Sequence, residues 1–274
     1  MQLITLTKEF KEESFIKFMG EIFTYPEIIS GSVKEIVITR DTLEESGRRA
    51  FEEGFHDAYS DTDLLLKVRL PKDGSVKPID YLKRIDRFGI SKDTALGWMF
   101  VPENNICRIA LKNGERYDLG FEFITDGDEL LDLGTFAGTE DSTLWPEENI
   151  NRFWFIEVQA LGKLYRKDYL ISAHLANMNC NDTLVMQMIM RDQEHSTNHH
   201  RYGYSEKLEY AEDLGKMPYK TDDETFNRIA DSIYAAALAY DRLAFNFYPH
   251  YEARSNEFFA LWDAYEAYRK IQQV

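Results

Sequence analysis

The stretch GRRAFEEGFHDAYSDTDLLLKVRL, residues 47–70, determines the expected fold of this chain, because it places two aspartates directly before a run of apolar residues. Asp61 and Asp63 are separated by one residue, and the apolar run after them predicts a buried strand that ends before Pro71. Side chains at positions i and i+2 of a strand point to the same face. The two carboxylates are therefore predicted to lie side by side where this strand begins.

Two neighbouring carboxylates repel each other, and a divalent cation relieves that repulsion. Mg²⁺ suits such a pair, because it binds through one or two protein carboxylates and keeps coordination places for substrate phosphates. The pair Asp61 and Asp63 thus indicates phosphoryl or nucleotidyl transfer. The alternative is a surface turn after Ser60, in which short acidic side chains accept hydrogen bonds from the local backbone.

A third carboxylate lies on a later predicted strand, ERYDLGFEFI, residues 115–124. This strand follows the pair Asn113-Gly114, a hairpin signal because both residues tolerate positive φ. Its alternation puts Asp118 on a polar face, where we expect it to complete a metal site with Asp61 and Asp63. The alternative is an exposed sheet face with a ladder of charges. The apolar face holds Tyr117, Leu119, Phe121 and Phe123, and the polar face holds Arg116, Asp118 and Glu122.

The periodicity of apolar residues divides the chain into two halves. Strand patterns mixed with helical ones fill the first half, whereas only long helical patterns follow from about residue 144. We therefore predict an α+β fold: an N-terminal mixed sheet with flanking helices over residues 1–143 and an all-helical domain over 144–274. The predicted strands are 33–39, 63–70, 96–101, 106–112 and 115–124, and the predicted helices are 8–24, 76–88, 149–175, 181–193, 222–246 and 255–272.

Composition excludes several classes of partner. The chain has 274 residues and a formal charge of −16, so it lacks the basic footprint that nucleic-acid binding needs. No run approaches the roughly 18 apolar residues of a membrane helix, and the first residues lack a signal-peptide layout. Cys107 and Cys180 form no disulfide framework, so we expect a cytoplasmic protein. An acidic surface is compatible with a small cationic substrate.

The order of these motifs resembles the nucleotidyltransferase superfamily typified by DNA polymerase beta. It is more similar to one branch, the aminoglycoside 6-adenylyltransferases. That family has a Gly-Ser-Arg-Ala turn, then Asp-x-Asp, then a Lys-Ile-Asp-Leu-like strand. The matching segments here are Gly47-Arg48-Arg49-Ala50, Asp61-Thr62-Asp63 and Arg116-Tyr117-Asp118-Leu119.

The helical half extends the resemblance in the same order. Phe153-Trp154 and the segment 162–167, GKLYRK, are similar to the family's Phe-Trp-Trp segment and its Lys-Gly-Leu-Trp-Arg-Lys. Residues 203–208, GYSEKL, resemble a loop that carries a Gly-Lys pair, and Phe247-Tyr248-Pro249 resembles a Tyr-Pro before the last helix. The likeness spans most of residues 35–270.

The resemblance implies Mg²⁺-dependent transfer of AMP from ATP to a hydroxyl of a small cationic acceptor such as an aminoglycoside, an antibiotic-resistance activity. It implies Asp61, Asp63 and Asp118 as catalytic metal ligands. The nucleotide would be bound by turn residues and by charges of the helical domain, for which solvated helix-face charges are the alternative. These nucleotide-binding residues are Gly47, Arg48 and Arg49 in the turn, and Lys163, Arg166 and Lys207 in the helical domain.

One position departs from the family pattern, since Arg48 replaces the turn serine. A guanidinium group can hold phosphate oxygens itself, which would keep the activity. Two other interpretations stay open: a nucleotidyltransferase with a different acceptor, or a non-catalytic descendant that binds a nucleotide or a partner.

Overall fold

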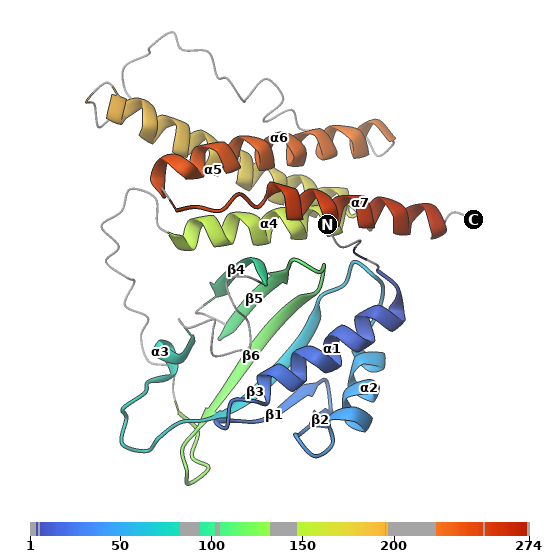
Figure 1. Cartoon of the computed structure of the whole chain (residues 1–274), viewed down its shortest axis with the longest axis vertical. Coiled ribbons are helices and arrows are strands. Elements are labelled where there is room, and N and C mark those ends of the chain that lie inside the picture. The colour runs from blue at the N-terminus through green and yellow to red at the C-terminus, as the bar shows by residue number, and fades with distance from the viewer. Residues whose placement is uncertain are drawn as a thin grey trace. The chain divides into compact units, whose positions relative to one another are not determined.

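The computed structural model describes residue 4 and residues 6–82, 94–101, 105–131, 147–194, 196, 223–248 and 250–272. Within them, six strands and seven helices form an α+β protein (Figure 1). The chain divides into two compact units, residues 1–140 with 270–274 and residues 141–269. Most of the loop in which the sequence placed the boundary, 135–149, lies outside the described residues.

The first unit is built on one mixed sheet with the strand order β2-β1-β3-β6-β5-β4. The central strands β3 and β6 pair in parallel, and every other neighbouring pair is antiparallel. The predicted mixed sheet is thus confirmed. Its strands are β1 (Ile28–Val33), β2 (Ile36–Ile38), β3 (Thr62–Arg69), β4 (Ala95–Val101), β5 (Ile106–Leu111) and β6 (Arg116–Ile124).

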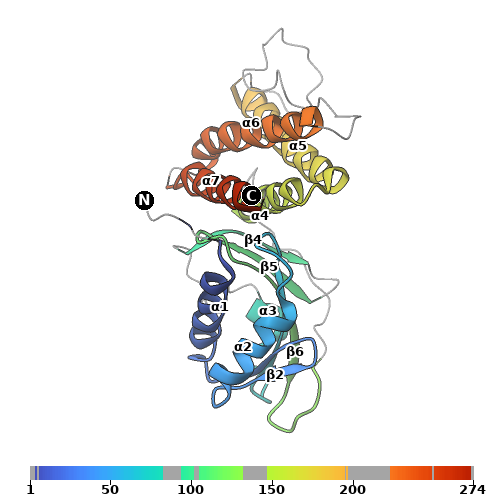
Figure 2. The ribbon, with the colours of Figure 1, turned by 90° about the vertical axis from the view of Figure 1, so that its right-hand side faces the viewer.

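Helices α1 (Lys8–Ile22) and α2 (Leu43–Gly54) cover one face of this sheet (Figure 2). Thr7 caps α1 by accepting a hydrogen bond from the N–H of Phe10. The apolar side of α1 meets the apolar side of β6, where Phe18 stacks on Tyr117 with ring centroids 4.0 Å apart. Because Tyr117 and Asp118 are adjacent in a strand, Asp118 points to the opposite face of the sheet.

Two details of the first unit differ from the sequence prediction. The strand predicted over residues 33–39 is confirmed only at Ile36–Ile38 (β2), because β1 ends at Val33 and the chain reverses at Lys34 to form the β1–β2 hairpin. Lys34 adopts φ 50°, a backbone conformation that is uncommon for residues other than glycine and that a lysine does not predict. Of the helix predicted over residues 76–88, the structure shows α3 (Pro78–Leu82); residues 76–77 are not helical, and residues 83–88 lie outside the described residues.

The second unit consists of helices α4 (Glu147–Tyr165), α5 (Tyr169–Glu194), α6 (Asp223–Phe247) and most of α7 (Ser255–Gln272). The predicted single helix over 149–175 is wrong, because the chain breaks after Tyr165 and Lys167 takes φ 63°. The core is aromatic: Phe153 stacks on Tyr240 at 3.5 Å, and the Trp154 indole donates a hydrogen bond to Tyr251. None of the described helices is both long and apolar enough to cross a bilayer.

Candidate active site

Asp63 and Asp118 occupy directly paired positions on the adjacent parallel strands β3 and β6. Residues paired across neighbouring strands send their side chains to the same face of the sheet. Both carboxylates therefore lie on the face opposite to α1 and α2, where both strands begin. Asp61 stands one residue before β3, two positions ahead of Asp63.

A hydrogen-bonded turn leads the chain to Asp61. The Asp57 carboxylate accepts bonds from the N–H of Tyr59 and from the Ser60 hydroxyl, as in an Asx turn. Arg116 of β6 then fixes this turn by donating to the carbonyl of Tyr59. Arg116 is only 3% exposed, so the segment before Asp61 is tied to the strand that carries Asp118.

Strand β5 adds a residue that the sequence reasoning did not select. Arg108 is paired in register with Asp118, and its Nε lies 3.0 Å from Oδ2 of that carboxylate. Asp63, Asp118 and Arg108 thus form a row across three strands on one face. A signal was present in the sequence: Arg108 is a single charge between Cys107 and Ile109 in an apolar strand, across the Asn113-Gly114 hairpin from Asp118.

The electrostatics of the row show that its negative charge is only partly compensated. The Asp118 side chain is 13% exposed, and this burial raises the pKa of its carboxyl to about 6. The Arg108 charge acts in the opposite direction, while Asp61 and Asp63 raise the Asp118 pKa further. The pKa of Asp63 is also raised. Although the Asp63 residue is exposed, partial desolvation of its carboxyl is the largest cause of this shift, and the charge of Asp61 is the next.

One carboxylate oxygen of the row lacks a hydrogen-bond donor. Oδ1 of Asp118 is buried and accepts no hydrogen bond. A buried carboxylate oxygen without a donor fits a hard cation, which prefers oxygen ligands. Within the described residues, however, no group of three or more His, Cys, Asp or Glu side chains could hold a metal ion. The shared Mg²⁺ site of Asp61, Asp63 and Asp118 therefore stays a prediction.

The glycine turn predicted at Gly47-Arg48-Arg49-Ala50 is wrong, because these residues lie in the middle of α2. Gly47 is buried, and a Cβ atom built on it would lie 2.6 Å from Cδ1 of Ile16 in α1. The absence of a side chain at Gly47 thus lets α2 approach α1 closely. A phosphate role for Gly47, Arg48 and Arg49 depended on the turn and has no support from this placement.

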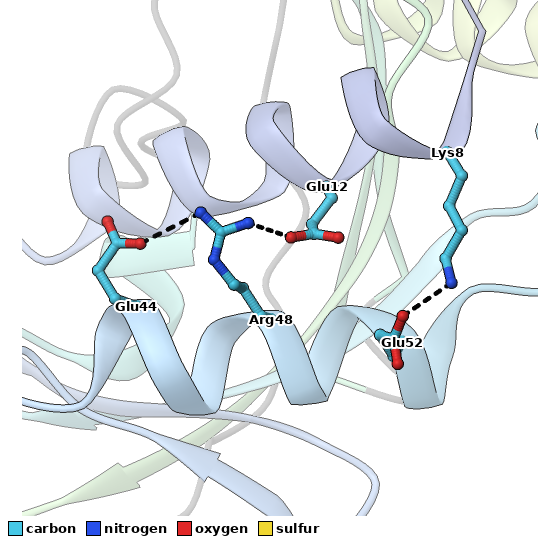
Figure 3. Close-up of polar contacts among 5 residues, drawn as sticks. All are labelled: Lys8, Glu12, Glu44, Arg48 and Glu52. Carbon is cyan, nitrogen blue, oxygen red and sulfur yellow. Dashed lines mark hydrogen bonds and ion pairs between the residues drawn. The ribbon is translucent and has the colours of Figure 1, made fainter.

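Arg48 instead pairs with glutamates of both helices (Figure 3). Its guanidinium contacts Glu12 of α1 and lies 3.4 Å from Glu44 of α2. The hydrogen bond to Glu12 raises the pKa of Arg48. A second pair, Lys8 with Glu52 at 2.8 Å, joins the same two helices. These two ion pairs link α1 to α2 on the surface of the first unit.

We expect Arg48→Met to weaken the packing of α1 on α2 slightly without changing nucleotide affinity. The loss of stability should disappear in about 1 M salt, where the Debye length is about 3 Å and exposed ion pairs are screened. Urea unfolding at low and high salt measures the first effect, and calorimetry with MgATP measures the second. The matched control is Glu12→Gln, which removes the partner charge. If Arg48→Met binds MgATP more weakly than wild type while Glu12→Gln does not, Arg48 belongs to the nucleotide site.

Two of the three predicted nucleotide-binding residues of the helical half lie in or near the second unit's α4. Lys163 belongs to the last turn of α4, with its Nζ 3.9 Å from Oδ2 of Asp168, and Arg166 follows the helix. Lys207 lies outside the described residues. Their contact with a nucleotide stays a prediction.

No protein-family model matches the chain, and no curated protein matches it. The function is therefore inferred from Asp61, Asp63 and Asp118, together called the carboxylate row, and from the neighbouring Arg108.

Proposed function

We propose that the chain is a Mg²⁺-dependent nucleotidyltransferase that moves AMP from ATP to a hydroxyl of a small cationic acceptor such as an aminoglycoside. The observation that carries the proposal is the direct pairing of Asp63 with Asp118 on two parallel strands, with Asp61 two residues ahead. Carboxylates gathered at one end of a sheet face fit a nucleotide bound with its cation.

In this proposal the acceptor oxygen attacks the α-phosphorus of ATP, the bond from that phosphorus to the bridging oxygen breaks, and pyrophosphate leaves. Bound Mg²⁺ would neutralise charge on the triphosphate and on the leaving pyrophosphate. Asp61 and Asp63 would hold it. Asp118 would either complete that set or accept the proton of the attacking hydroxyl, and a pKa of about 6 suits a base at neutral pH.

The charge of the chain supports a cationic acceptor. A formal charge of −16 attracts polyamines and aminoglycosides and repels polyanions. Arg108 and Arg116 are two cations close to the carboxylates. Arg108, whose side chain is 31% exposed, gives the triphosphate a local partner despite the acidic surroundings.

A second candidate function is nucleotide or partner binding without catalysis. Two observations favour it: Arg108 already pairs with Asp118, and the segment that resembles the nucleotide turn is helical. Under this proposal the carboxylate row still supplies negative charge to the site, but the protein transfers no nucleotide.

Incubation of the protein with Mg²⁺, labelled ATP and a panel of aminoglycosides separates the two candidates. We expect pyrophosphate release and an acceptor whose mass increases by one adenylyl group, both dependent on Mg²⁺. Nucleotide binding without turnover on any acceptor would favour the binding protein. Absence of both binding and turnover would exclude the nucleotidyltransferase and the nucleotide-binding protein, and would leave partner binding as the remaining function.

A further inference from the structure

We infer that Arg108 is the internal counter-cation of the carboxylate row and that it competes with a divalent cation for Asp118. The inference rests on the proposed function, because it concerns how the same site is loaded. Its basis is geometric: Arg108 and Asp118 are register partners on neighbouring strands, and Nε lies 3.0 Å from Oδ2. The other oxygen of Asp118 is buried and without a hydrogen-bond partner.

The contact compensates charge but is poorly aligned. Nε of Arg108 is itself buried and makes no hydrogen bond, although it is within ion-pair distance of Asp118. A bidentate fork, the strong form of this pair, would occupy both carboxylate oxygens. Here only Oδ2 is approached, so the guanidinium balances the charge without completing the shell of Asp118. Such a pair can exchange for another cation at small cost in hydrogen bonds.

A divalent cation and the guanidinium cannot both be close to Asp118 without repulsion. Divalent binding therefore requires Arg108 to move away, and this lowers the affinity of the empty site for the cation alone. Once displaced, the guanidinium remains beside the row, and its planar fork matches phosphate oxygens. A nucleotide would thus stabilise the displaced state. Cation and nucleotide should bind with positive coupling, each raising the affinity for the other.

The same sheet face provides a matched control. Lys67 of β3 lies four residues after Asp63, and its Nζ is 3.0 Å from Glu122 of β6. Four residues along a strand span roughly 13 Å, more than the Debye length at physiological salt. Removal of Lys67 changes the net charge by the same amount as removal of Arg108, but far from Asp118.

The test is Mn²⁺ binding, followed by electron paramagnetic resonance and calorimetry at about pH 8, above the pKa of about 6 for Asp118. Wild type, Arg108→Met, Arg108→Lys and Lys67→Met are compared with and without a non-hydrolysable ATP analogue. Without nucleotide, we expect Arg108→Met to bind Mn²⁺ about ten- to a hundredfold more tightly, the size of one charged contact. Arg108→Lys and Lys67→Met should stay close to wild type. The gain in Mn²⁺ affinity on adding the analogue should shrink in Arg108→Met.

Three results of this experiment would contradict the inference. Equal Mn²⁺ affinity in wild type and Arg108→Met overturns the counter-cation while leaving the proposed function intact. An equally large change in Lys67→Met shows a general charge effect and also overturns it. If no variant binds Mn²⁺ with or without nucleotide, the proposed function fails and the inference with it. Circular dichroism checks folding, and Arg108→Gln replaces the methionine variant if that variant does not fold.

Discussion

Asp63→Asn should abolish Mg²⁺-dependent nucleotide binding and transfer while the chain keeps its fold. The substitution removes one anionic oxygen from the row and retains the size of the side chain. A metal ion contributes several kcal/mol of transition-state charge stabilisation. Since each 1.36 kcal/mol corresponds to a factor of ten, the loss of turnover should reach about a thousandfold or more.

The same substitution should leave stability unchanged or raise it slightly. The pKa of Asp63 is raised in the folded state by desolvation and by Asp61. An acid with a raised folded-state pKa binds protons more readily in the folded chain, so its contribution to stability falls as pH rises above the unfolded value of about 3.9. Asparagine carries no such charge, and neutral pH therefore favours the variant.

Calorimetry with MgATP and urea unfolding measure the two effects separately. The control is Glu122→Gln, which removes a carboxylate from the same strand face, four residues after Asp118. It should leave nucleotide affinity unchanged. Wild-type affinity for MgATP in Asp63→Asn would show that the carboxylate row does not hold the cation of the nucleotide.

The sequence predicted the parts of the site that depend on strand alternation. Asp63 and Asp118 share a face because β3 and β6 alternate apolar and polar residues, and Gly114 takes φ 90° in the hairpin that its pair with Asn113 predicts. The partner Arg108 also followed from that hairpin, because the turn sets which residue of β5 faces Asp118. It was missed because the apolar residues of the strand dominated its interpretation.

The errors arose where tertiary contacts decide the local structure. Glycine at position 47 predicts a turn from local preferences, yet it serves close packing against Ile16, a residue of another helix. The chain reversals at Lys34 and Lys167 depend on positive φ at lysine, which no local rule favours. Glutamates on helices usually face solvent, so no local rule predicts the burial of Glu157 either.

Glu157 lies in the middle of α4 and is 0% exposed, between the buried residues Ile156 and Val158. Neither carboxylate oxygen has a hydrogen-bond partner. Burial raises the pKa of Glu157 well above its ordinary value, and the neighbouring Asn179 amide acts in the other direction. That amide already donates to the carbonyl of Phe153, and its own oxygen accepts no bond. The site therefore favours a neutral side chain with a donor.

We expect Glu157→Gln to stabilise the protein by about 1–3 kcal/mol at neutral pH, the usual cost of leaving buried polar groups unsatisfied. The glutamine amide is neutral and can donate to Asn179. The sign follows from linkage: the folded-state pKa of Glu157 is raised, so wild-type stability falls as pH rises above the unfolded value of about 4.3. Glu157→Gln lacks this titrating group, so its free energy of unfolding relative to wild type should increase from pH 5 to pH 8.

Urea unfolding of both proteins at successive pH values measures the difference directly. Subtraction of the two curves removes the contributions of other titrating groups, including Asp118 with its pKa of about 6. Glu148→Gln, at an exposed position of the same helix, is the control and should show no pH-dependent advantage. A glutamine variant less stable than wild type at every pH would mean that Glu157 is ionised in the fold, balanced by a cation, and that the helical unit contains a buried charge pair.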